Sequence, residues 1–179
     1  MKGRHYMINK IVRITPVGKS KFVYISEPDT QFDSRGIYHC SVAFEKKEGE
    51  LEKKAINDVI SKKIAEAHKA RPGTKEVKRA PLPFKEEDGK IVIKFKSKFK
   101  PTIFDRDQNE LSPDIAVWKD STMRIRYELN GYDQTVGVGC SLYLLSVQVV
   151  DLVKGSSQNG KCQFSKVESA LPAQEKAVY

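Results

Sequence analysis

The chain has 179 residues, of which 39% are hydrophobic, and its 32 Lys and Arg against 23 Asp and Glu give a formal net charge of +9. This length favours one domain with terminal extensions over two domains. No stretch approaches the roughly 20 apolar residues of a membrane-spanning helix, and no apolar run follows the basic N-terminus, so we expect a cytosolic protein without a signal peptide.

The first half of the chain predicts two strands and a helix. Residues 22–25 are β-branched or aromatic and run into a turn signal at Pro28, which indicates a strand. Residues 46–69 carry apolar side chains at spacings of three and four, which predicts a helix that ends before Pro72. Between them, residues 36–44 alternate in size, and we expect the larger set to face the core: Tyr38, Cys40, Val42 and Phe44.

The second half predicts a loop over residues 72–90 and then further strands. Asn130-Gly131 is a strong hairpin signal between a strand over 123–129 and a long strand over 135–153. Gly137 and Gly139 inside that long strand indicate a bend or a close approach of another backbone segment. About five strands with one helix predict a mainly β protein with an OB-fold, a five-stranded antiparallel barrel with one inserted α-helix.

The charge distribution suggests how the chain is divided. Residues 1–21 contain six basic and no acidic side chains, and residues 72–100 contain nine basic and four acidic ones. We expect a basic N-terminal arm over 1–20, the OB-fold over 21–153 and a flexible C-terminal tail over 154–179. Two basic segments favour a polyanionic partner, although a charge of this size also serves solubility alone.

Residues 90–100 have the most informative pattern. If Ile93, Phe95 and Phe99 face the core, the lysines between and after them face outward: Lys94, Lys96, Lys98 and Lys100. Side chains two apart on a strand are about 6.6 Å apart, close to the phosphate spacing of an extended single strand. The alternative is a strand edge charged to prevent aggregation.

A second basic strand strengthens the interpretation as a nucleic-acid surface. Arg124 and Arg126 alternate with apolar residues, and we expect this strand to be a neighbour of the lysine strand, so that the two form one groove. Tyr132 and Trp118 lie outside the apolar periodic faces and are the candidates for base stacking. Lys10 and Arg13 of the arm would extend the path of the bound nucleic-acid strand.

Other kinds of site find little support. The three cysteines and three histidines are too dispersed for a zinc site or a disulfide framework, so no metal or cofactor is expected: Cys40, Cys140, Cys162, His5, His39 and His68. A metal-dependent nuclease that uses Asp105, Asp107 and Asp114 is an alternative, but acids in loops are more often solvated turn formers.

Several short motifs follow one another over residues 20–153: Phe22-Val23-Tyr24-Ile25-x-x-Pro28-Asp29, Arg35-Gly36-Ile37-Tyr38, Ile93-Lys94-Phe95-Lys96, Arg124-Ile125-Arg126-Tyr127, Tyr132 and Val136-Gly137. Their order and spacing resemble those of the single-stranded DNA-binding proteins of T-seven-type bacteriophages. The resemblance implies an OB-fold with a helix, replication, recombination, repair and strand annealing in the cytoplasm of an infected cell, and contacts with a replicative polymerase and a helicase–primase. By position it implies that Lys96 and Arg35 contact DNA and that Tyr132 stacks on a base.

Two features depart from that family. Lys98 stands where the family has a second stacking aromatic on the lysine strand. The family ends in a strongly acidic tail, whereas residues 154–179 hold two glutamates against four lysines, which puts recruitment of replication partners by the tail in doubt.

We therefore predict a non-enzymatic protein that binds single-stranded DNA without sequence preference, and that can associate with other copies on the strand. The lysines and arginines neutralise phosphates while Tyr132 and Trp118 stack on bases. A single-stranded RNA-binding OB module and the nuclease remain the alternatives.

Overall fold

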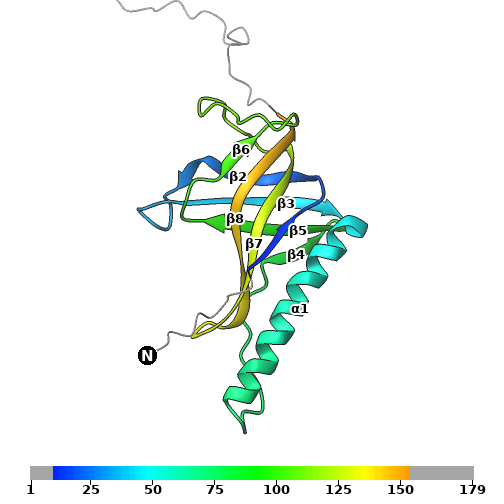
Figure 1. Ribbon diagram of the computed structural model, residues 1–179, viewed down its shortest axis with the longest axis vertical. Helices are drawn as coiled ribbons and strands as arrows, with labels where there is room; N and C mark the ends of the chain where they lie inside the picture. Colours follow the sequence, from blue (N-terminus) through cyan, green and yellow to red (C-terminus); the bar gives the residue numbers. More distant parts are fainter. Residues whose placement is uncertain (1–9, 154–179) are drawn as a thin grey trace, which may run out of the picture.

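The computed structural model describes residues 10–153, which form eight strands and one helix (Figure 1). In chain order these are β1 (Ile11–Ile14), β2 (Gly18–Asp29), β3 (Ile37–Glu45), α1 (Lys46–Ala70), β4 (Phe84–Glu87), β5 (Lys90–Ser97), β6 (Thr102–Phe104), β7 (Thr122–Gln134) and β8 (Gly137–Asp151). No helix among residues 10–153 is long and apolar enough to cross a membrane.

Five of the strands form a closed ring. The hydrogen-bonded order is β2, β3, β5, β8 and β7, and β7 pairs again with β2. Four of these contacts are antiparallel, and the β5–β8 contact is parallel. The remaining strands add to the edges of this ring: β1 pairs with β7, β4 with β5, and β6 with β8.

The interior of the ring is filled by the apolar side chains of alternating positions, as the pattern predicts. Cys40, Val42 and Phe44 of β3 are fully buried, and Phe95 of β5 packs against Tyr127 of β7 with ring centroids 5.0 Å apart. The inward orientation predicted for Phe99 is wrong, because its side chain is 82% exposed. β5 ends at Ser97, whose Oγ accepts a hydrogen bond from the Phe99 N–H and so turns the chain out of the strand.

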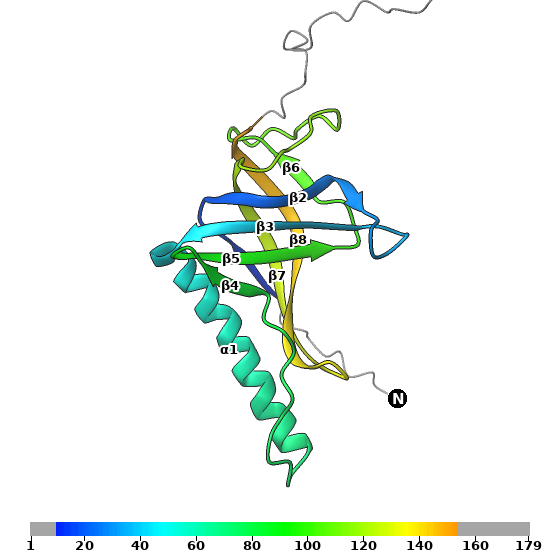
Figure 2. The same ribbon diagram turned by 180° about the vertical axis from the view of Figure 1, so that it is seen from behind.

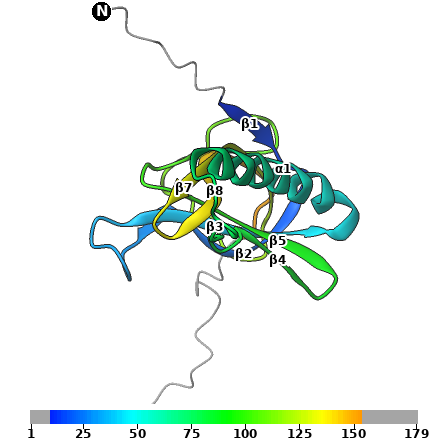
Figure 3. The same ribbon diagram turned by 90° about the horizontal axis from the view of Figure 1, so that it is seen from below.

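The predicted helix is confirmed as α1, which extends beyond the ring alongside the β7–β8 hairpin (Figures 1 and 3). It buries Ile56, Ile60 and Ala67, whereas Leu51 is exposed. The turn predicted at Asn130-Gly131 is wrong, because both residues lie inside β7. A Cβ atom on Gly131 would lie 2.5 Å from Cγ of Lys63, so this glycine lets the helix approach the strand rather than reversing the chain.

The chain reverses instead between β7 and β8, against residues 78–80. Gly137 has φ +123°, and a Cβ atom there would lie 2.8 Å from backbone atoms of Lys78, Arg79 and Ala80. The Ala80 N–H donates to the Val138 carbonyl, and the Val138 N–H donates to the Lys78 carbonyl. The close backbone approach predicted from the two glycines of this strand is therefore confirmed.

Two segments predicted to lack regular structure contain strands. Residues 11–20, which we assigned to an arm, form β1 and the start of β2, and the loop predicted over 72–90 contains the short strand β4. The predicted tail over 154–179 and the first nine residues of the predicted arm lie outside the described residues.

Candidate nucleic-acid interface

Strands β2, β3 and β5 are neighbours in the sheet (Figure 2). Their outer face carries both aromatic and basic side chains. In the register of the sheet Tyr24 is opposite His39, and His39 is opposite Lys96. The next row along the strands places Phe22 opposite Ser41 and Ser41 opposite Lys94. Strand alternation explains both rows, because the residues between them face the core.

The loop between β2 and β3 closes one side of this face. Phe32 at its tip is 89% exposed, and together with the two rows it lines a groove of about 420 Å³. We call this the aromatic groove, and its lining residues are Phe22, Tyr24, Asp29, Gln31, Phe32, Asp33, Ile37, His39, Lys94 and Lys96. Tyr143 on β8 is 47% exposed and pairs in register with Lys96, so a further ring lies beside the groove.

Tyr24 and His39 line the aromatic groove and are in contact with each other. Their ring centroids are 4.8 Å apart, and His39 Nε2 lies 2.9 Å from a carboxylate oxygen of Asp29. This hydrogen bond, the Gln31 N–H and the charge of Lys94 together lower the pKa of Asp29. The contact between His39 and Asp29 thereby fixes the start of the β2–β3 loop to the sheet.

The acidic side chains of the groove are compensated locally, whereas its lysines are not. Asp33 accepts hydrogen bonds from the Arg35 guanidinium at 3.2 Å, and these bonds together with nearby Lys98 lower the pKa of its carboxyl group. Within residues 10–153 none of the predicted lysines has a carboxylate oxygen within 4.0 Å: Lys94, Lys96, Lys98 and Lys100. Their charges are therefore available to a polyanion.

The aromatic groove continues towards two of the predicted residues. Tyr24 also lines a neighbouring hollow of about 620 Å³ that contains Lys100 and Trp118. Trp118 is 54% exposed there. The structure therefore brings the lysine strand and the predicted tryptophan onto one connected surface, with Tyr24 at the junction. Arg35 adjoins this surface through its ion pair with Asp33.

The other predicted residues lie elsewhere. The expectation that the arginine strand neighbours the lysine strand is wrong, because β8 lies between β5 and β7 in the ring. Arg124 and Arg126 line a separate hollow that shares no residue with the aromatic groove. Lys10 lies at the β1 edge, 3.6 Å from Glu128.

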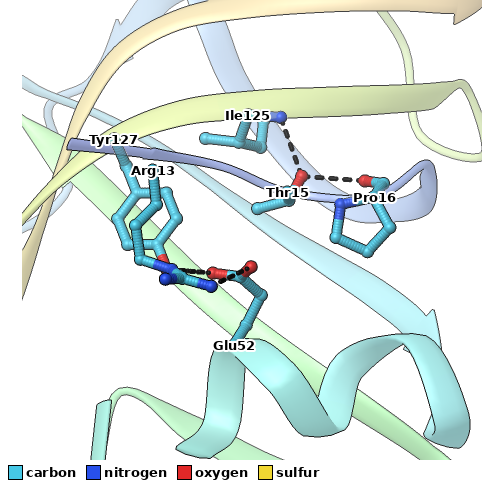
Figure 4. A network of polar contacts seen from close by, with 6 residues as sticks. All are labelled: Arg13, Thr15, Pro16, Glu52, Ile125 and Tyr127. Carbon is cyan, nitrogen blue, oxygen red and sulfur yellow. Dashed lines mark hydrogen bonds and ion pairs between the residues drawn. The ribbon is translucent and has the colours of Figure 1, made fainter. Parts of the chain in front are cut away.

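Arg13 is half-buried and points towards α1, where it pairs with a buried carboxylate (Figure 4). Its guanidinium donates two hydrogen bonds of 2.9 Å to the carboxylate of Glu52, which also accepts a hydrogen bond from the Tyr127 hydroxyl. Glu52 is nearly fully buried on α1, and burial together with this bond raises the pKa of Tyr127. Arg13 thus compensates a buried charge and joins β1 to the helix.

Tyr132 lies on the β7–β8 hairpin, away from the aromatic groove. It is half-buried and pairs with Gly139, where a Cβ atom would lie 2.8 Å from the tyrosine hydroxyl. Its ring therefore lies over the glycine. The stacking role expected for Tyr132 stays a prediction, as do the DNA contacts of the other predicted residues.

The acidic loop residues offer no metal site in the part of the chain that the structure describes. Asp105 accepts hydrogen bonds from the backbone N–H groups of Asp107 and Asn109, which lower the pKa of its carboxyl group. No group of three or more His, Cys, Asp or Glu within residues 10–153 could hold a metal ion. Asp105 is a turn former there.

Sequence reasoning missed the aromatic residues of the groove. A signal was present, because Val23 and Ile25 are the apolar partners that would face inward and so turn Phe22 and Tyr24 to the same outer face. Phe32 and His39 had no such signal. Only the closure of the β2–β3 loop over the sheet shows that they share a groove.

The five-stranded ring, with its single parallel contact and one inserted helix, is an OB-fold, so the predicted fold class is confirmed. No protein-family model matches the chain, and no curated protein sequence matches it significantly. Among solved structures it is similar to gp2.5, a single-stranded DNA-binding protein encoded by bacteriophage T7, at 21% identity and a TM-score of 0.68, over 89% of this chain and 100% of that one.

A second similar structure comes from another phage. The single-stranded DNA-binding protein of bacteriophage Enc34 in complex with single-stranded DNA has 15% identity and a TM-score of 0.59, over 81% of this chain and 89% of that one. Its C-terminal truncation has 18% identity and a TM-score of 0.60, over 78% and 85%. The resemblance inferred from the sequence motifs is thus confirmed at the level of the fold.

Proposed function

We propose that the protein binds single-stranded DNA without sequence preference, and that the aromatic groove is the main binding surface. The observation that carries the proposal is the pair of rows on β2, β3 and β5, in which the exposed rings of β2 lie across β3 from lysines of β5. Within residues 10–153 these lysines have no carboxylate oxygen within 4.0 Å. Rings stack on any base, and ammonium groups attract any phosphate, so neither contact depends on sequence. The fold shared with two phage proteins named for this activity supports it.

The path proposed for the DNA strand follows the two connected hollows. Bases stack on Phe22, Tyr24 and Phe32, while Lys94 and Lys96 neutralise the phosphates beside them. The strand then passes Tyr24 towards Lys100 and Trp118. An OB-fold covers about 4–16 nucleotides, and we expect a site size within this range.

The test is a competition among three unlabelled polymers for the protein bound to a fluorescent oligothymidine. We expect single-stranded DNA to compete more strongly than duplex DNA or RNA of the same length, and the affinity to fall by about 0.7 log units per log unit of salt for each phosphate contacted. RNA as the stronger competitor would replace the proposal with the RNA-binding alternative, because only contacts to the 2′-hydroxyl separate the two polymers. Affinity that does not change with salt would contradict the electrostatic contacts.

A separate incubation tests for catalysis. We propose that the protein is not an enzyme, since Asp105 is occupied by its own turn. Labelled single strands incubated with Mg²⁺ or Mn²⁺ are expected to stay intact. Cleavage that Asp105→Ala abolishes would establish the nuclease instead.

We further propose that this binding serves phage DNA replication, recombination and strand annealing in the cytoplasm of an infected cell. The support is the likeness to phage proteins of this fold. Sedimentation with and without oligothymidine tests self-association on DNA, and co-precipitation with a replicative polymerase or helicase–primase tests those partners.

A further inference from the structure

Strands β1, β7, β8 and β6 are neighbours in the sheet, on the side of the ring opposite β3 (Figure 1). Their side chains line a second groove. In the sheet register Arg126 lies between Ile14 and Ser146, and Arg124 is opposite Gln148, which in turn is opposite Phe104. The hollow has a volume of about 390 Å³. We call it the arginine groove, and its lining residues are Ile14, Phe104, Gln108, Arg124, Arg126, Ser146 and Gln148.

Both arginines of this groove keep their charge uncompensated. Within residues 10–153 neither has a carboxylate oxygen within 4.0 Å, whereas Arg13, Arg35 and Arg71 each form an ion pair. Arg124 donates from Nε to the Thr15 carbonyl at 3.2 Å, which fixes the direction of its guanidinium and leaves the terminal nitrogens for another partner. Two uncompensated guanidinium groups beside one hollow favour an anionic ligand with more than one charge.

The rest of the lining fits a nucleotide strand. Residues two apart on β7 are about 6.6 Å apart, close to the repeat of phosphates in an extended strand, and guanidinium groups bind phosphate oxygens in a bidentate manner. Ile14 on β1 is 56% exposed and Phe104 on β6 is half-buried, so apolar side chains for contact with a base lie on both sides of the arginines. Gln108, Ser146 and Gln148 add hydrogen-bonding groups.

We propose that the arginine groove binds a second segment of single-stranded DNA, separate from the segment in the aromatic groove. This inference rests on the proposed function, because a strand already held on one face is present at high effective concentration for the other. The two grooves share no lining residue, and β7 pairs with neither β3 nor β5. A short oligonucleotide therefore fills the aromatic groove alone, and only a long strand or a second strand reaches the arginines.

The experiment compares oligothymidines of about 8 and about 30 nucleotides, the shorter within the range of one OB-fold. The variants are Arg126→Gln, whose side chain makes no hydrogen bond or ion pair among the described residues, and the double variant Arg124→Gln/Arg126→Gln. The matched control, Lys62→Gln/Lys69→Gln, removes the same charge from exposed positions on α1. Unfolding temperatures verify that each variant is folded.

For the long strand we expect the salt slope to fall by about 0.7 in the single variant and about 1.4 in the double variant, with no change beyond the control for the short strand. Equal decreases in the salt slope for the short and the long oligonucleotide would overturn the proposal, because the arginines would then belong to the main binding surface. Long-strand binding that matches the control would also overturn it, and loss of oligoglutamate binding in that case would assign the groove to an acidic peptide. Failure of the wild-type protein to bind either oligonucleotide would instead refute the proposed function.

Discussion

The ring of Tyr24 lies against the imidazole of His39 across the β2–β3 pair, with centroids 4.8 Å apart and planes inclined by 35°. His39 is held in turn by Asp29, at 2.9 Å, so the orientation of the tyrosine is coupled to the start of the β2–β3 loop. A ring oriented before the ligand arrives loses little freedom when a base stacks on it. Tyr24 is therefore the aromatic residue whose removal is expected to affect binding most.

Tyr24→Ala should weaken binding of single-stranded DNA by about 1–3 kcal/mol, the usual contribution of one stacked base. The salt slope should stay unchanged, because no phosphate contact is lost. Fluorescence titrations at four salt concentrations measure both quantities. Leu51→Ala, on the exposed face of α1, is the control, and a Tyr24→Ala variant that binds like it would exclude Tyr24 from the interface.

Lys96→Ala should have the complementary effect. Its ammonium group is exposed and has no carboxylate within 4.0 Å in residues 10–153, so its loss should lower the salt slope by about 0.7 and weaken all sequences alike. Lys54→Ala removes an equal charge from an exposed position on α1. If the two variants have the same slope, the effect comes from net charge and the position of Lys96 is irrelevant.

Alternation of side chains allowed much of the fold to be predicted. The inward set of β3, the outward lysines of β5 and the length of α1 follow from local periodicity, which a strand or helix expresses wherever it lies. The turn prediction at Asn130-Gly131 is wrong because a glycine that permits a turn also permits the close approach of a helix. Only the position of Lys63 distinguishes the turn from the helix contact. Local sequence carries no information about that contact.

The site could be predicted only in part, for a related reason. The lysines of β5 were identified because they share one strand, but which strands are neighbours depends on closure of the ring. The sequence pattern therefore places Arg124 and Arg126 in one groove with these lysines, whereas β8 separates the two strands, and it gives no sign that Arg13 pairs with Glu52, 39 residues away. A buried glutamate in a charged helix looks like any solvated one until the helix is packed.

Glu52→Gln should destabilise the protein by about 1–3 kcal/mol, because it leaves the half-buried Arg13 guanidinium without its counter-charge. Asp58→Asn, an equivalent change at an exposed position of the same helix, should be nearly neutral. Urea unfolding followed by circular dichroism measures both free energies. The double variant Arg13→Gln/Glu52→Gln should recover part of the loss; if it loses as much as the two single variants added together, the pair is not coupled.

Gly137→Ala should destabilise the hairpin by two separate effects. The φ of +123° is unfavourable for any residue with a Cβ atom, at about 1–3 kcal/mol, and the added atom would also meet the backbone of residues 78–80 at 2.8 Å. Gly73→Ala separates the effects, since Gly73 has φ +95° with no heavy atom within 4 Å of the added Cβ. A thermal unfolding series should rank Gly137→Ala well below Gly73→Ala. Equal unfolding temperatures would show that residues 78–80 move away freely.

The stability of the folded protein should depend on pH in the acid range. Hydrogen bonds from His39 and the Gln31 N–H, together with the charge of Lys94, lower the pKa of Asp29 from its usual value of 3.8. The unfolded chain then binds more protons than the folded one near pH 4, so this contribution to stability is complete above that pH and is lost as the pH falls through the lower, folded pKa. Asp33 and Asp105 follow the same rule, since their pKa values are lowered as well.

Urea midpoints measured from pH 6 to pH 2.5 should therefore decline below about pH 4, and Asp29→Asn should make the decline shallower than Asp58→Asn does. Identical pH profiles for the two variants would mean that the contact between Asp29 and His39 does not stabilise the folded state.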